Sequence, residues 1–200
     1  MRGQVIPSTL GNVKLVAHYQ DGSTVVGEDR IPKALKPIKR VTLTPDQSLA
    51  TPDALKAIKE AQIIVLGPGS LYTSIIPNLL IKEISQAIAE SGAIKVYVCN
   101  MMTQPGETDN YSVSDHITAL ASHSYAHILD YCVVNNGAVP AEVLERYSKQ
   151  NSQLVVNDRR KIENMGYRVV EEDFSIIQDG VIRHDPEKLA KIILSFIEEI

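Results

Sequence analysis

The chain has 200 residues, of which 44% are apolar and 22% charged, with a formal net charge of −4 and an isoelectric point near 5.7. This composition supports a sizeable core in one large domain or two small ones, and it argues against a surface that attracts nucleic acid phosphates in general. No apolar run approaches the roughly 18 residues that a membrane span needs, so we expect a cytoplasmic protein.

The N-terminal part is predicted to be antiparallel. Residues 13–29, "VKLVAHYQDGSTVVGED", place two β-rich runs around Asp21-Gly22, a dipeptide that favours a tight hairpin turn. Residues 39–46 form a further candidate strand. A helix is expected over 51–61, because Thr51 can cap it and Pro52 fits its first position.

From residue 61 onward, short apolar runs rich in β-branched residues alternate with helical patterns, which is typical of a parallel sheet with crossover helices. The runs contain Cys99 and Cys132, which are expected to be reduced core residues because their spacing suggests neither zinc nor a disulfide scaffold. The predicted strands lie at 61–67, 93–100, 129–136, 153–158, 167–173 and 181–185. The predicted helices are 74–91 with Ser74 as cap, one opening at Ser112 or Ser114, 140–150, and 185–200 with Asp185 as cap.

The predicted fold class is therefore α/β. We expect a Rossmann-like, doubly wound, mostly parallel sheet with an N-terminal antiparallel β-hairpin as an appendage. Residues 1–200 are interpreted as a single domain, with the appendage at 1–45 and the α/β core at 50–200.

In open parallel sheets, ligands bind beyond the carboxyl ends of the strands. The first loop at such an end, "GPGSLYTS", offers Gly67 and Gly69 for close backbone approach and Ser70, Thr73 and Ser74 as hydroxyl donors where a helix begins. We expect a phosphate there; the alternative is a tight turn with a capped helix and no ligand. The loop is neither a Walker loop nor the dinucleotide fingerprint, since the required Gly-Lys and glycine spacings are absent.

The second loop, "NMMTQPGETDNYS", is long and polar, as functional loops often are. Its two carboxylates could bind sugar hydroxyls or a hydrated magnesium ion, or could simply be solvated or capping groups, and acid and base roles are unassigned. The candidate residues are Asn100, Thr103, Gln104, Gly106, Glu107, Thr108 and Asp109.

Other candidate residues are less specific. Asn135, at the end of the third buried run, could contact a ligand or form a turn. His116, His123 and His127 fall near one helix, but no second ligand set accompanies them, so no metal site is predicted. No glycine-flanked serine elbow supports a hydrolase.

With "GPGSLYTSIIPNLL", "NMMTQPGETDNYS", "VIPST" near the start, "VVNN" and "RHD", the chain resembles the YvcK/CofD-like family, and most closely its gluconeogenesis factor branch. The resemblance implies a Rossmann-type fold and a regulatory protein that binds uridine diphosphate sugars and links carbon metabolism to envelope synthesis and cell shape. It supports the loop holding Gly67, Gly69, Ser70, Tyr72, Thr73 and Ser74 and the stretch from Asn100 to Asp109 as two walls of the site.

The resemblance also implies an alternative function. The CofD branch consists of magnesium-dependent transferases that act on a nucleotide diphosphate-linked donor, so magnesium is the one cofactor to consider, with Glu107 and Asp109 near the diphosphate. A third interpretation is a structural remnant whose loops bind nothing.

One departure from the family pattern concerns the sheet. The glycine-rich strand-loop-helix and the Asp-Asp-Gly-Gly segment that usually open the family's proteins are absent from this sequence. We therefore expect the sheet to expose an apolar edge and face, which predicts either instability or pairing with another chain, for example in a homodimer.

Overall fold

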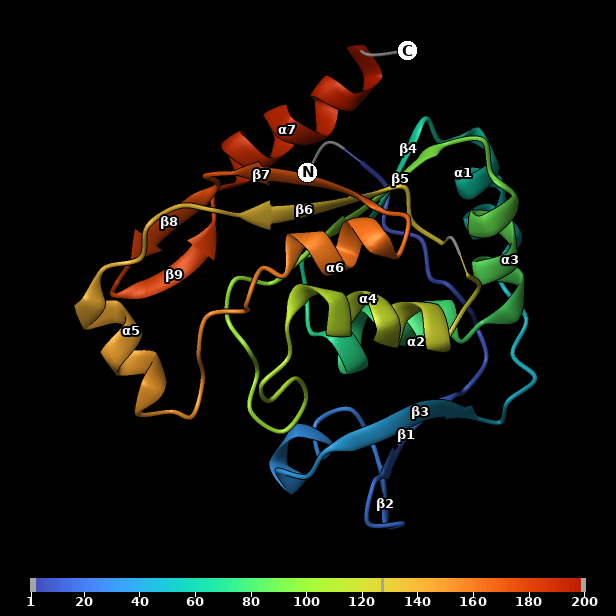
Figure 1. The fold of residues 1–200 in the computed structure, drawn as a ribbon. Helices are drawn as coiled ribbons and strands as arrows, with labels where there is room; N and C mark the ends of the chain where they lie inside the picture. The colour runs from blue at the N-terminus through green and yellow to red at the C-terminus, as the bar shows by residue number, and fades with distance from the viewer. Residues whose placement is uncertain (1–2, 127, 199–200) are drawn as a thin grey trace.

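The N-terminal part of the chain is a three-stranded antiparallel sheet. The computed structural model describes residues 3–126 and 128–198, and Figure 1 shows this sheet at one end of the molecule. Its strands are β1 (Lys14–Tyr19), β2 (Thr24–Val26) and β3 (Ile38–Thr44), in the order β2-β1-β3, and a short 3-10 turn, η1 (Pro32–Ala34), precedes β3. The predicted hairpin and the predicted third strand are confirmed.

The central sheet is parallel. Its strands are β4 (Ile63–Leu66), β5 (Ile94–Val98), β6 (Tyr131–Asn135) and β7 (Arg168–Glu172), in the order β4-β5-β6-β7. A separate antiparallel hairpin follows, formed by β8 (Ser175–Gln178) and β9 (Val181–His184). The predicted α/β class with a mostly parallel sheet is confirmed, although β8 was not predicted.

Three helices begin at expected caps. The Thr51 hydroxyl accepts from the Ala54 amide at the start of α1 (Pro52–Glu60), and Ser112 forms a capping box with Asp115 at α4 (Val113–Ser122). Asp185 accepts the amides of Glu187 and Lys188 at 3.0 and 3.1 Å and so caps the last helix. That last helix is α7 (Pro186–Glu198), and α5 (Ala141–Ser148) and α6 (Arg159–Asn164) lie between α4 and α7 in the sequence. The last two residues of the predicted 185–200 helix lie outside the described residues.

Two predicted elements are wrong. The helix expected over 74–91 is divided into a π-helical turn (Leu71–Ile75), α2 (Ile76–Leu79) and α3 (Lys82–Glu90), because Ile81 has an extended backbone between α2 and α3. Ser74 is not the cap, since its amide already donates to the Ser70 carbonyl. The strand expected over 153–158 makes only isolated bridges, Met102 with Leu154 and Ser112 with Val156, because this segment pairs with a loop and not with the sheet.

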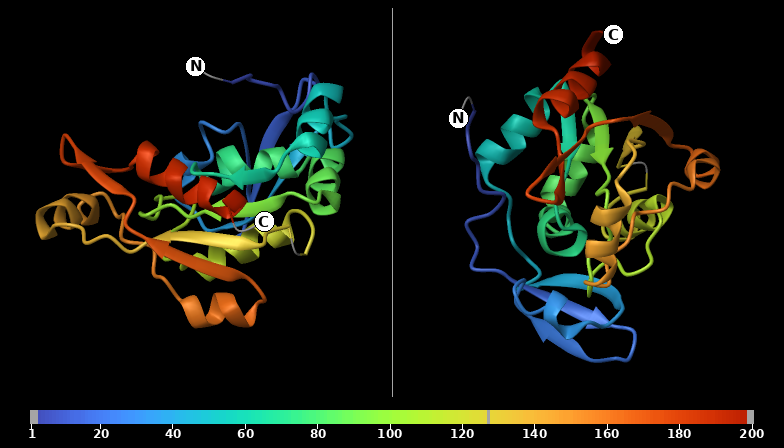
Figure 2. Two further views of the ribbon diagram at one scale, coloured as in Figure 1. Left: turned by 90° about the horizontal axis from the view of Figure 1, so that it is seen from above. Right: turned by 90° about the vertical axis from the view of Figure 1, so that its left-hand side faces the viewer.

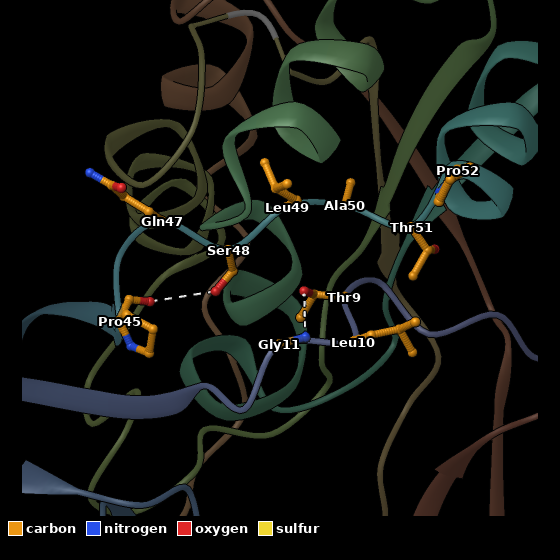
Figure 3. A pocket seen from close by; sticks show the side chains of 10 residues that line it. All are labelled: Thr9, Leu10, Gly11, Pro45, Gln47, Ser48, Leu49, Ala50, Thr51 and Pro52. Carbon is orange, nitrogen blue, oxygen red and sulfur yellow. Dashed lines mark hydrogen bonds between the residues drawn. The ribbon is translucent and has the colours of Figure 1, made fainter.

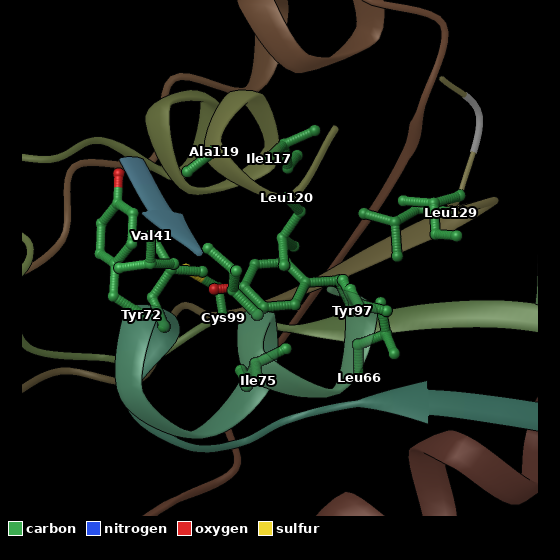
Figure 4. Packing of buried hydrophobic residues seen from close by; sticks show 14 of the residues in the cluster. Val41, Leu66, Tyr72, Ile75, Tyr97, Cys99, Ile117, Ala119, Leu120 and Leu129 are labelled. Carbon is green, nitrogen blue, oxygen red and sulfur yellow. The ribbon is translucent and has the colours of Figure 1, made fainter. Parts of the chain in front are cut away.

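The two faces of the parallel sheet bury different side chains. Along β5, Tyr97 belongs to one buried cluster, whereas Val96 and Val98 belong to the other because neighbouring side chains of a strand alternate between faces. Helices α2, α4 and α6 cover the first face of the sheet and α7 covers the second (Figures 1 and 2). The larger core lies on the first face, where Tyr97 packs against Leu120 and Leu66 (Figure 4), and it includes Tyr19 and other side chains of the N-terminal sheet. Among the described residues, none of the helices is long and apolar enough to cross a membrane.

Candidate ligand-binding site

Strands β4 and β5 are neighbours, so the loops that leave their carboxyl ends meet at one edge of the sheet. Gly67 is required at the start of the first loop because its φ is +89° and an added Cβ would lie 2.9 Å from the Val98 carbonyl oxygen. An added Cβ on Gly69 would come no closer than 3.5 Å to its neighbours, which is ordinary contact. Only the first glycine is therefore dictated by the backbone.

Direct hydrogen bonds join the two predicted walls. The Asn100 amide donates to the Gly69 carbonyl at 2.7 Å, and the Ser70 hydroxyl donates to the Gln104 side-chain oxygen at 2.7 Å. The structure thus brings the loop at 67–74 and the loop at 100–109 together, as the strand-end argument predicted.

Glu107 lies between these loops and is only 3% exposed. Its carboxyl group accepts hydrogen bonds from the Thr73 hydroxyl at 2.8 Å, the Gln104 side-chain amide at 3.0 Å and the Tyr72 backbone amide at 3.2 Å. Burial raises the pKa of Glu107 above the ordinary glutamate value, and hydrogen bonds from Thr73 and Tyr72 offset part of the rise. The Glu107 carboxyl group therefore already occupies the Tyr72 amide at the start of the helical segment.

The other polar residues of the second loop stabilise its shape. The Thr103 hydroxyl accepts a hydrogen bond from the Gln153 backbone amide at 3.0 Å, and the Thr108 hydroxyl accepts one from the Gln104 backbone amide at 2.9 Å. The carboxylate of the exposed Asp109 accepts a hydrogen bond from the Gly106 backbone amide at 2.8 Å. Gly106 has a φ of +79°, and a Cβ there would overlap the Pro32 carbonyl of η1. The loop is therefore fixed against the N-terminal sheet.

These residues do not form a preorganised set of oxygen ligands for magnesium. Both oxygens of Glu107 are used by protein donors, and Asp109 is one exposed carboxylate. The described residues contain no group of three or more His, Cys, Asp and Glu side chains that could hold a metal ion.

Asn135, His116 and His123 make structural contacts. Asn135 accepts the Phe174 amide at 3.0 Å and so ties the end of β6 to the chain beyond β7. His116 is buried in α4 and His123, just after α4, is half-buried; burial lowers the pKa of both imidazoles. His127 lies outside the described residues.

Three residues near the site were not among the predicted site residues. The Ser8 hydroxyl donates to the Asn78 side chain at 2.6 Å, and Asn78 donates to the Ser74 carbonyl at 2.8 Å, so the N-terminal segment forms a further border of the first loop. The Tyr111 hydroxyl bonds the Tyr72 hydroxyl at 2.8 Å. Ser8 and Asn78 are 70 positions apart in the sequence, so no local pattern predicts their contact. The "VIPST" motif is the one sequence signal that included Ser8.

A cavity of about 350 Å³ lies beside the first loop, bordered by Gly67, Pro68, Gly69, Ser74 and Asn78. A second cavity of similar volume, shown in Figure 3, lies between the N-terminal segment and the connection from β3 to α1, lined by residues such as Leu10 and Leu49. Neither cavity is lined by a charged side chain. The cavity beside the first loop is the one that lies at the carboxyl end of β4, where open parallel sheets bind ligands.

The family model described as CofD, 2-phospho-L-lactate transferase, matches residues 1–175. This chain belongs to the CofD family. Among CofD family relatives, it is 44% identical to a putative gluconeogenesis factor of Clostridium acetobutylicum over 98% of this chain and 44% of that protein. It is 40% identical to the gluconeogenesis factor of Bacillus subtilis over 100% of this chain and 63% of that protein.

Solved structures agree with this membership. A crystal structure of a Bacillus halodurans protein superposes with a TM-score of 0.94 and 42% identity, covering 96% of this chain and 62% of that chain. A second structure from that organism, described as a member of the UPF0052 family, gives a TM-score of 0.92. The chain thus spans between 44% and 63% of the lengths of these relatives.

Proposed function

We propose that this CofD family chain forms part of a cytoplasmic regulatory protein of the gluconeogenesis factor type that binds a uridine diphosphate sugar and links carbon metabolism to envelope synthesis and cell shape. The observation that carries the proposal is the hydrogen-bonded pair of loops at the carboxyl ends of β4 and β5. The names of its relatives support the regulatory role.

The side chains at the site favour binding over turnover. Glu107 is buried and bonded on both oxygens, which leaves it poorly placed to act as an acid or base. The Ser74 side chain, in contrast, is exposed on the cavity beside Gly69 and can donate to a phosphate oxygen.

A magnesium-dependent transferase that acts on a nucleotide diphosphate-linked donor is the second candidate, favoured by the description of the family model. Because the chain's own residues form no cage for the ion, such an activity would depend on the phosphates of the donor to hold magnesium.

The experiment is a thermal-shift titration with UDP-glucose, with and without magnesium, followed by an assay for released UDP. We expect the ligand to raise the melting temperature without release of UDP over hours. Ser74→Ala should weaken binding by about tenfold, as expected for one charge-assisted hydrogen bond, whereas Thr24→Ala on the exposed strand β2 should not. Magnesium-dependent UDP release would favour the transferase, and no shift at millimolar ligand would overturn both candidates for this donor.

A further inference from the structure

The N-terminal sheet is held against the rest of the chain by apolar packing and by one hydrogen bond. Its inward side chains belong to the larger core. Among the described residues, a single hydrogen bond joins 13–46 to the chain beyond residue 48, from the Val41 backbone amide to His123 Nε2 at 3.0 Å. The ion pairs of the described part of this sheet stay within it. His123 therefore makes the one directional polar contact between the sheet and α4.

The contacts of its two ring nitrogens determine the protonation state of His123. Nδ1 lies 2.7 Å from the Ala119 carbonyl oxygen, which can only accept, so Nδ1 carries the proton. Nε2 accepts a hydrogen bond from the Val41 amide and must therefore be unprotonated. The contact thus requires a neutral imidazole, because a second proton on Nε2 would face the Val41 N–H directly.

The Val41 amide has no strand partner to replace His123. The strand order β2-β1-β3 leaves β3 at an edge of its sheet, and Val41 is only 1% exposed. A buried backbone N–H without an acceptor is unfavourable. Protonation of His123 would therefore remove the acceptor and leave this amide unpaired in the interior.

The groups around the imidazole also disfavour a second proton. Burial lowers the pKa of His123 below its ordinary value of 6.5, and the positive charge of Arg40 on β3 lowers it further, while the Ala119 carbonyl offsets part of the fall. From the π-helical turn, Tyr72 packs edge-on with its ring centroid 5.8 Å away, and burial raises the pKa of its phenol, so it stays uncharged. On the helix side, the Ser122 hydroxyl lies 3.2 Å from Nδ1.

We propose that His123 is an acid-sensitive latch, which holds β3 on α4 while the imidazole is neutral and releases the N-terminal sheet when Nε2 takes up a proton. The released state binds a proton more readily than the held state. The contribution of the latch is therefore complete above the ordinary histidine pKa of 6.5 and is lost as the pH falls below it. This device is independent of the proposed ligand.

The test measures hydrogen exchange of the 200-residue chain by NMR at about pH 7.5 and about pH 5, with each rate expressed as a protection factor. We expect protection of the Val41 amide to fall by about tenfold or more relative to the buried amides of β5. The imidazole nitrogen shifts of His123, recorded in the same samples, should change over the same pH range.

Two variants separate His123 from the other titratable groups. His123→Gln places an acceptor that takes up no proton near the Val41 amide, so its protection should fall by less than about threefold. His18→Gln is the matched control, because His18 on β1 bonds Thr42 within the same sheet, and it should lose protection as the wild type does.

Three results would overturn the proposal. An equal loss of Val41 protection in the wild type and in His123→Gln would assign it to another group, such as the buried His116. An equal loss across β3 and β5 in the wild type would show that acid unfolds the whole chain without releasing the sheet first. The third is an imidazole of His123 that stays neutral until the whole chain unfolds.

Discussion

On one face of the parallel sheet, helices that connect the strands bury side chains such as Tyr97 and Cys99, whereas on the other face α7 and Phe174 pack against Val96 and Val98. The first face also receives the N-terminal sheet. The difference shows that covering one face is built into the strand-helix-strand connections, while covering the other depends on segments added from elsewhere in the sequence.

The largest expected effect contrasts buried side chains on the two faces. Ile117, on α4, is 0% exposed, so Ile117→Ala should lower the free energy of unfolding by about 2–5 kcal/mol. Ile193→Ala, at a partly buried position of α7, should cost about 1 kcal/mol or less. Urea denaturation of both variants measures the contrast, and equal losses would contradict it.

A smaller effect is expected at Gly67, directly after the carboxyl end of β4. Gly67→Ala places a side chain at positive φ and against the Val98 carbonyl, so it should destabilise the fold by about 1–3 kcal/mol. Gly69→Ala is the matched control and should change stability by less than about 0.5 kcal/mol. Similar losses in the two variants would show that the turn tolerates a Cβ at both positions.

The smallest expected effect is a pH dependence of the folding stability that arises from Glu107. A carboxyl group whose pKa is raised by burial stabilises the folded state most below its ordinary pKa of 4.5, and this contribution is lost as the pH rises through the folded value. The stability of the wild type relative to Glu107→Gln should therefore fall as the pH rises above 4.5.

Urea denaturation of both proteins across this range measures the difference. All other titratable groups are shared, so their contributions cancel. A difference that rises with pH would mean that the donors from Thr73, Gln104 and Tyr72 outweigh burial at Glu107.

The main strands could be predicted because their apolar, β-branched runs are long enough to be read locally, and the caps at Thr51, Ser112 and Asp185 mark helix starts chemically. Helix α6 was missed because it has six residues with a single buried side chain, Ile162. The break at Ile81 was missed because the apolar pattern continues through it.

The meeting of the two loops could also be predicted, since it follows from strand order at a sheet edge. The orientation of Glu107 could not, because its carboxylate is fixed by partners 34 and 35 residues away in the sequence. Whether a side chain faces solvent or protein in such a loop depends on these distant contacts, which local patterns do not encode. Binding of a ligand by these residues stays a prediction.

The contact between Gly106 and Pro32 leaves no room for a Cβ and joins the second loop to the N-terminal sheet. A displacement of that loop must either carry the three antiparallel strands with it or separate two backbones that touch. We therefore expect the N-terminal sheet and the second loop to move together.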